Sequence, residues 1–169
     1  GMLYYAPQGW ISDDTDAAER VRIQYGTSMC YPISSMGSHV SVVPNHQLNR
    51  ITSLHTRANV AYFGTFGYEL DLNKLTDEEI AEVKAQIIFM KEYRELIQFG
   101  NFYRLKSPFD GNETVWMTVS EDKRKALVFW YRERNVVNAE FTRVRLQGLD
   151  PDLIYKNEYN GTENYGDEL

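Results

Sequence analysis

The sequence has little cysteine and little positive charge. Cys30 is the single cysteine among the 169 residues, so the chain can form no internal disulfide and no cysteine-ligated metal cluster. The formal net charge is −6, which argues against nucleic acid as a partner, because binding to phosphates needs clustered lysine and arginine. A reducing, cytoplasmic setting therefore fits the composition best.

Long hydrophobic runs and several catalytic signatures are also missing. No apolar stretch approaches the roughly 20 residues of a membrane-spanning helix, so we expect no membrane association. His39, His46 and His55 are seven and nine positions apart, whereas the zinc-protease motif places two histidines four apart on one helix. Ser34 and Ser35 lack the G-x-S-x-G context of a serine-hydrolase nucleophile. We therefore expect structural or surface histidines, no metal site and no cofactor.

Hydrophobic and aromatic residues are plentiful instead. They make up 43% and 14% of the chain, which is enough to bury a core and excludes a disordered tail. Most large aromatic side chains pack in cores and interfaces. An aromatic face is also suited to stacking on the C–H groups of a sugar, so Trp10 is a candidate substrate-binding residue.

The first half of the chain alternates between strand and helix patterns. The run MLYYA at 2–6 is short and apolar and ends before a proline, which is typical of a buried strand. Asp16 has the position of a helix N-cap and Glu19 completes a capping box, so we expect a helix that ends at Gly26. A second strand is expected near 40–43 and a helix around 56–66. This order resembles the end of an alternating β/α array, such as a barrel.

The second half changes from a long helix to short strands. Thr76 and Glu79 form a capping box that predicts a helix over 77–99, with one apolar stripe along it. Beyond Gly100, alternating segments separated by turn-forming clusters indicate antiparallel β structure. We place a domain boundary there, which divides the chain into 1–100 (α/β) and 101–169 (all β). The expected strands are FYRL, TVWMTVS, KALVFWYR, FTRVRLQG and LIYKNEY.

Three aspartates, Asp13, Asp14 and Asp16, follow Trp10 at the entrance to the first helix. In a barrel enzyme the catalytic groups lie in loops that lead from strands to helices, and Asp13 and Asp14 would occupy such a loop. Crowded carboxylates beside a helix N-terminus suit a group that gives up and regains a proton. A purely structural role is the alternative: Asp16 caps the helix, Asp14 interacts with its dipole and Asp13 is solvated.

Two long segments carry a specific family resemblance. One is WISDDTD at 10–16 and the other is SMGSHVSVVPNHQ at 35–47. Together with RANVAYFGTFGYELDLNKLTDEE, KEYRELIQFGNFYRL and GLDPDLIY, they make nearly the whole chain resemble the melibiase-type α-galactosidases. These are retaining glycoside hydrolases of clan D, which also contains raffinose-type galactosyl enzymes.

The resemblance implies a large enzyme with a (β/α)₈ TIM barrel between two β-sandwiches. Residues 1–100 would be its last βα units and residues 101–169 part of its C-terminal antiparallel β-sandwich. The family hydrolyses terminal α-linked galactose, as in melibiose and raffinose, by a retaining double displacement. Its general acid/base maps onto the W-x-S-D-D segment, which implies Asp13, with Asp14 as the alternate.

The sequence departs from this family in what it does not contain. The family's nucleophile lies in a K-W-D-type motif on an earlier strand, and these 169 residues have no such motif. We therefore expect a segment of an α-galactosidase that is inactive alone. A non-catalytic remnant that binds sugar or protein, and transfer of galactose to another sugar, are the alternatives. Unpaired strand edges favour a homo-oligomer, such as a swapped dimer.

Overall fold

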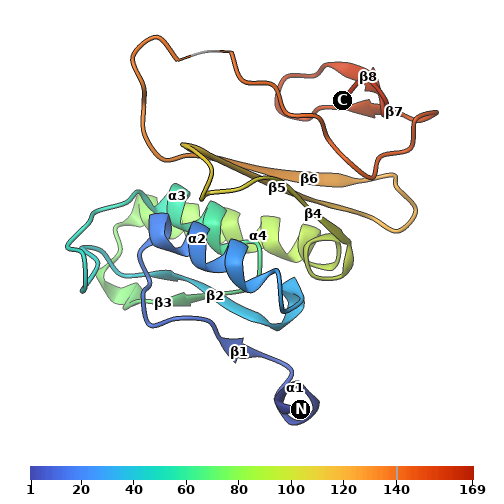
Figure 1. The fold of residues 1–169 in the computed structure, drawn as a ribbon. Coiled ribbons are helices and arrows are strands. Elements are labelled where there is room, and N and C mark those ends of the chain that lie inside the picture. Colours follow the sequence, from blue (N-terminus) through green and yellow to red (C-terminus); the bar gives the residue numbers. More distant parts are fainter. Residues whose placement is uncertain (140) are drawn as a thin grey trace. The chain divides into compact units, whose positions relative to one another are not determined.

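The computed structural model describes residues 1–139 and 141–169. The chain divides into two compact units, residues 1–98 and residues 99–169. The first combines helices with parallel strands, and the strands of the second are antiparallel (Figure 1). None of the helices in the described part of the chain is long and apolar enough to cross a membrane.

A parallel sheet organises the first unit. Its strands are β1 (Gly9–Trp10), β2 (Met36–Ser41) and β3 (Thr65–Glu69), in that order. The register pairs Trp10 with Gly37 and His39 with Gly67. Parallel neighbours need crossover connections, and α2 (Ala17–Thr27) and α3 (Leu54–Ala61) supply them. The carboxyl ends of the three strands consequently meet at one edge of the sheet.

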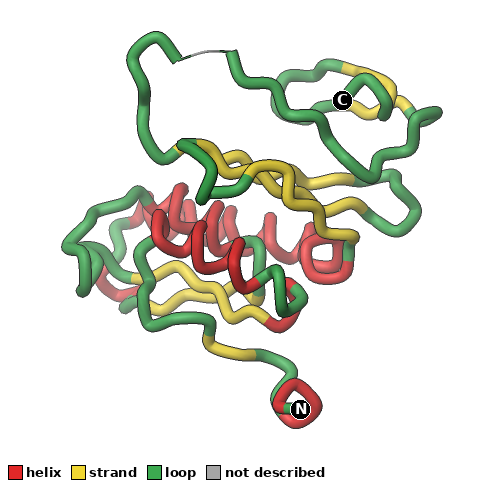
Figure 2. The backbone as a smooth tube through the Cα atoms, viewed as in Figure 1, coloured by secondary structure: helices red, strands yellow, loops and turns green. Residues whose placement is uncertain are grey.

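Helices cover one face of this sheet, and the core of the unit lies between them and the strands (Figure 2). Val21 of α2, Val40 of β2 and Val60 of α3 are each at most 2% exposed. The long helix α4 (Asp77–Phe99) adds an aromatic contact, since the rings of Tyr62 and Phe89 lie 4.6 Å apart. Short 3₁₀ turns at Ile33–Ser35 (η1) and Leu72–Lys74 (η2) complete the unit.

The predicted long helix is confirmed, together with its capping box. The Thr76 hydroxyl accepts the Glu79 N–H (3.2 Å), and the Glu79 carboxylate accepts the Thr76 N–H (2.9 Å). Two donors that a helix N-terminus would leave unpaired are thereby satisfied. Along the predicted stripe, Val83, Met90 and Ile97 are buried.

The second unit is built on a three-stranded antiparallel meander of β4 (Asn101–Lys106), β5 (Glu113–Val119) and β6 (Ala126–Arg132). Val115, Trp116, Met117 and Val119 of β5 are at most 1% exposed and belong to the buried part of this sheet. A separate hairpin pairs β7 (Ile154–Lys156) with β8 (Glu163–Tyr165).

Two predictions at the N-terminal end of the chain are wrong. Residues 2–6 are not a buried strand: Met2–Tyr5 form one helical turn, α1, in which Tyr4 and Tyr5 are both 86% exposed. β2 pairs instead with Gly9 and Trp10, and the Tyr4 N–H donates to the Gly1 carbonyl (3.1 Å).

The next helix also ends differently from the prediction. Gly26 lies inside α2 and does not cap it. The cap is Ser28, whose N–H donates to the Gln24 carbonyl (2.9 Å) and whose hydroxyl donates to the Tyr25 carbonyl (2.6 Å). The N–H and hydroxyl of Ser28 therefore satisfy carbonyls of the last turn, which we expected a capping glycine to do.

The expected helix over 56–66 is wrong in its second half. It ends at Ala61, and β3 begins at Thr65. Gly64 permits this sharp change, because a Cβ there would lie 2.8 Å from the Met36 carbonyl oxygen. Phe66 and Tyr68, two residues apart, then give the period-two pattern of a strand.

Two segments of the second unit also differ from the prediction. Residues 141–148, which lie within the described part of the chain, form no strand, whereas Glu163–Tyr165 form the unpredicted β8. Alternating side chains are not enough for a strand, because the backbone also needs a ladder partner. Leu146 donates its backbone N–H to the Leu169 carbonyl (2.9 Å).

Candidate active site

The carboxyl edge of the parallel sheet gathers side chains from all three strands. On β2, Met36, Ser38 and Val40 are buried, so the intervening His39 lies on the opposite face. Trp10 ends β1 and Glu69 ends β3. The loop from β1 to α2 adds Asp13 and Asp14 at the same edge. This is the position at which parallel α/β folds hold their ligands.

Trp10 and Asp13 form a direct pair. The indole Nε1–H of Trp10 donates to Oδ1 of Asp13 at 3.0 Å. Both side chains are exposed, and Trp10 retains 56% of its accessible surface. An aromatic face and a carboxylate therefore stand next to each other where a ligand can reach them.

Asp14 has a different environment from Asp13. It is half-buried, and its Oδ1 accepts the backbone N–H of Asp16 at 3.0 Å. Its own N–H donates to the Ser12 hydroxyl, also at 3.0 Å. The Asp14 carboxylate consequently closes the turn that leads into α2.

Asp16 is the N-cap of α2, as the sequence predicts. Its Oδ2 accepts the N–H groups of Ala18 (3.0 Å) and Glu19 (3.1 Å). The other half of the predicted capping box is wrong, because Asp14 and not Glu19 accepts the Asp16 N–H. The Glu19 carboxylate instead lies 3.9 Å from Arg50.

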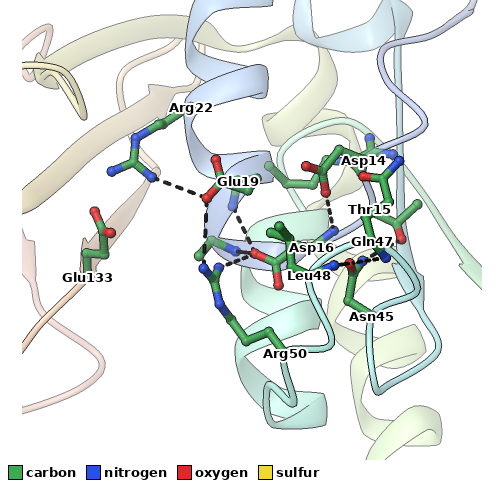
Figure 3. A network of polar contacts seen from close by, with 12 residues as sticks. Asp14, Thr15, Asp16, Glu19, Arg22, Asn45, Gln47, Leu48, Arg50 and Glu133 are labelled. Carbon is green, nitrogen blue, oxygen red and sulfur yellow. Dashed lines mark hydrogen bonds and ion pairs between the residues drawn. The ribbon is translucent and has the colours of Figure 1, made fainter.

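The loop after β2 fastens the same turn from the other side, as Figure 3 shows. Arg50 forms an ion pair with the buried Asp16 carboxylate. The Asn45 side chain donates to the Thr15 hydroxyl (3.2 Å), and its Oδ1 accepts the N–H of Leu48 (2.8 Å). Asn45 and Arg50 therefore hold the acidic turn in place.

The side chain of Arg20 supports the acidic loop by binding backbone carbonyls. The guanidinium donates to the carbonyls of Ser12 (2.8 Å), Asp14 and Gly37 (3.4 Å), and it lies 6.0 Å from the centre of the Trp10 ring. Burial lowers the pKa of Arg20, while the nearby carboxylates oppose this effect. A buried guanidinium is thus bound to the loop that carries Asp13 and Asp14.

His39 stacks on Trp10, with ring centres 4.4 Å apart and planes at 26°. Its Nε2 lies 2.7 Å from the Glu69 carboxylate, and its side chain is 9% exposed. Burial lowers the pKa of His39, Arg20 lowers it further, and Glu69 only partly compensates. The neutral imidazole is therefore the favoured form at neutral pH.

The structure thus brings Trp10 and Asp13 together and turns the Asp14 carboxylate toward the backbone. The sequence did not indicate His39, Glu69 or Arg20 as members of this edge. The G-S-H-V-S alternation places position 39 on the face opposite the core, but only once the parallel register is known. Among the described residues, no group of three or more His, Cys, Asp and Glu side chains is arranged to hold a metal ion.

Comparison with known proteins gives two family matches. Residues 1–100 match the melibiase family, and residues 113–169 match the C-terminal domain of glycosyl hydrolase family 36. Alpha-galactosidase AgaA of Geobacillus stearothermophilus is 56% identical over 100% of this chain, which covers 23% of that enzyme. The bifunctional alpha-galactosidase/sucrose kinase AgaSK of Mediterraneibacter gnavus is 50% identical over 100% of this chain and 18% of its own length.

Solved structures agree with these sequence matches. The crystal structure of AgaA superimposes with a TM-score of 0.96 over 100% of this chain and 23% of AgaA. A variant of AgaA in complex with raffinose superimposes with a TM-score of 0.97 at 55% identity, again over 100% of this chain and 23% of the relative. The chain therefore spans about a quarter or less of the length of the relatives it matches.

Proposed function

This chain belongs to the melibiase family, and from that premise we propose that it forms part of a cytoplasmic α-galactosidase. The enzyme removes terminal α-linked galactose from oligosaccharides by retaining double displacement. The relatives that support this substrate class include AgaA variants crystallised with raffinose and with stachyose.

In this proposal, residues 1–100 are the last βα units of the catalytic TIM barrel and residues 101–169 are part of the C-terminal β-sandwich. The parallel order β1-β2-β3 with helical crossovers supports the first assignment, and the antiparallel order β4-β5-β6 supports the second. Exposed strand edges keep the swapped dimer as a prediction, which the mass of the chain in solution tests.

Asp13 is the general acid/base of the proposed reaction. The observation that carries this assignment is the contrast between the two neighbouring acids: Asp13 is exposed and paired with Trp10, whereas Asp14 accepts a backbone N–H of its own turn. A carboxylate has two oxygens, so Oδ2 of Asp13 can bear the proton while Oδ1 accepts from the indole. Trp10 offers the galactose ring an aromatic face.

The chemistry then takes two steps. Asp13 protonates the glycosidic oxygen while a nucleophile from outside these 169 residues attacks the anomeric carbon. Asp13 next removes a proton from the water that releases galactose from the enzyme. We expect the isolated chain to show no turnover of an aryl α-galactoside, because the reaction needs the nucleophile as well as Asp13. Turnover that Asp13→Asn abolishes would contradict this expectation.

A chimera tests the assignment of Asp13. In it, these 169 residues replace the matching segment of AgaA, and Asp13→Asn is compared with Asp14→Asn. We expect Asp13→Asn to reduce kcat/KM for raffinose by roughly 10²–10⁴-fold. The loss should be much smaller for 2,4-dinitrophenyl α-galactoside, whose leaving group needs no protonation. An equal loss on both substrates, or a larger leaving-group dependence in Asp14→Asn, would overturn the assignment.

A further inference from the structure

We infer that His39, backed by Glu69, is a positioning residue that holds the Trp10 indole against Asp13. This inference rests on the proposed function, because it concerns the support of the proposed acid/base. It starts from three side chains that reach the same edge from three consecutive parallel strands: Trp10 from β1, His39 from β2 and Glu69 from β3.

The strand register makes room for this row. Trp10 pairs with Gly37, and His39 pairs with Gly67. Neither glycine adds a side chain next to the stacked rings, and a Cβ at Gly37 would lie 3.1 Å from the Gly9 carbonyl oxygen and 3.9 Å from the Trp10 Cα. The indole can therefore lie over the imidazole, with ring centres 4.4 Å apart, while the imidazole edge reaches the Glu69 carboxylate at 2.7 Å.

Trp10 needs such support because its own strand gives little. β1 is two residues long and pairs with β2 on one side. The indole is more than half exposed, so core packing does not fix its rotamer. His39, by contrast, is 9% exposed and belongs to a six-residue strand that pairs with both neighbours. The buried imidazole ring of His39 therefore restrains the exposed indole ring of Trp10.

The acidic loop has its own independent anchors. Arg20 binds the Ser12 and Asp14 carbonyls, and Arg50 and Asn45 hold the residues that follow. Removal of the His39 ring should consequently leave the loop and the fold in place. What it should release is the indole, and with it the hydrogen bond that fixes Oδ1 of Asp13.

The exchange of the Trp10 indole proton with water measures this release in the 169-residue chain. The ¹⁵N-labelled chain gives indole signals that Trp10→Phe assigns, and Asp13→Ala, which has no side-chain acceptor, sets the exchange rate without the hydrogen bond. His39→Leu keeps apolar bulk but removes the ring, so we expect exchange about fivefold faster, matching Asp13→Ala. His39→Phe keeps an aromatic surface and should restore slow exchange.

His46→Ala is the matched control, since His46 is an exposed histidine outside the row. The Val40 amide signal reports whether β2 remains folded in each variant. Slow exchange in His39→Leu with an unchanged Val40 signal would overturn the inference. So would fast exchange in both His39→Leu and His39→Phe, because stacking would then not be the cause.

The chimera with AgaA separates this inference from the proposed function. There, His39→Leu should reduce kcat for raffinose about fivefold more than for 2,4-dinitrophenyl α-galactoside, and His39→Phe should recover most of the difference. Equal losses on both substrates in His39→Leu would contradict the positioning role. Failure of the proposed function has another signature, namely full raffinose activity in Asp13→Asn.

Discussion

Asp13 in the first unit and Glu113 in the second are carboxylates in opposite environments. In the second unit, Glu113 is 10% exposed and accepts hydrogen bonds from Lys106 (2.9 Å) and Arg132 (2.6 Å). In the first, Asp13 and Glu69 are exposed at the strand ends, and Trp10 gives Asp13 its hydrogen bond. A carboxylate closed between two cations contributes stability, whereas an accessible carboxylate beside an aromatic face remains available to a ligand.

The pKa values express the same contrast. Burial alone would raise the pKa of Glu113, but the hydrogen bonds from Lys106 and Arg132 outweigh it and lower the pKa to about 2. Glu113 therefore stays ionised over the whole physiological range. His39, on the first unit, is held in its neutral form by burial and by Arg20.

The largest expected loss of stability is confined to the first unit. Gly64→Ala places a Cβ against Ser38 and 2.8 Å from the Met36 carbonyl, so we expect a loss of about 2 kcal/mol in its free energy of unfolding. Urea unfolding followed at the Val40 amide measures this loss. Gly67→Ala is the matched control, because a Cβ there meets nothing within 4 Å. Equal effects of the two substitutions would contradict the close approach.

A somewhat smaller effect should be confined to the second unit. Glu113→Gln removes the charge that Lys106 and Arg132 share, and we expect a cost of about 1.5 kcal/mol, because both cations are partly exposed. The amides of β5 report this change during urea unfolding. An unchanged midpoint at β5 would show that the closed cluster does not stabilise the unit.

The sequence predicted what depends on neighbours along the chain. The capping box of α4, the N-cap Asp16 and the strands around 101–132 all follow from local spacing, and the structure contains them. The sequence could not predict the features that depend on strand pairing across the sheet. β3 was missed because Gly64 needs the contact with β2 to explain it, and residues 141–148 have the pattern of a strand but no ladder partner.

The candidate site divides in the same way. Trp10 and Asp13 lie three residues apart, so the sequence could pair them. His39 and Glu69 reach them only through the parallel register, which joins residues 29 and 30 positions apart in the sequence. The distinct environment of Asp14 was also not predictable, because it depends on the turn conformation that directs its carboxylate to the Asp16 N–H.

A loss of about 1 kcal/mol is expected in the first unit when the N-cap is removed. Asp16→Ala leaves the N–H groups of Ala18 and Glu19 without their acceptor and deprives Arg50 of its partner. Asp16→Asn keeps an oxygen acceptor and should cost less, so the pair separates capping from charge. If Ala and Asn are equally destabilising in urea, the ion pair dominates and the capping account is wrong.

The smallest effect separates the two units by pH. The pKa of His39 is lowered in the folded chain, so its contribution to stability is present above about 6.5 and is lost as the pH falls below that value. The pKa of Glu113 is lowered from 4.5 to about 2, so its contribution is lost only between these values. A change from pH 7 to pH 5 should therefore lower the stability against urea at the Val40 amide while leaving that of the β5 amides unchanged. His39→Phe should remove this difference between the two units.

The most direct test of the account is the product that the AgaA chimera forms in the presence of azide. In a retaining enzyme without its acid/base, a small anion can attack the galactosyl-enzyme without needing deprotonation. Asp13→Asn, given 2,4-dinitrophenyl α-galactoside and sodium azide, should regain turnover and release α-galactosyl azide, whereas Asp14→Asn should release galactose. Formation of the azide product by Asp14→Asn and not by Asp13→Asn would contradict the account.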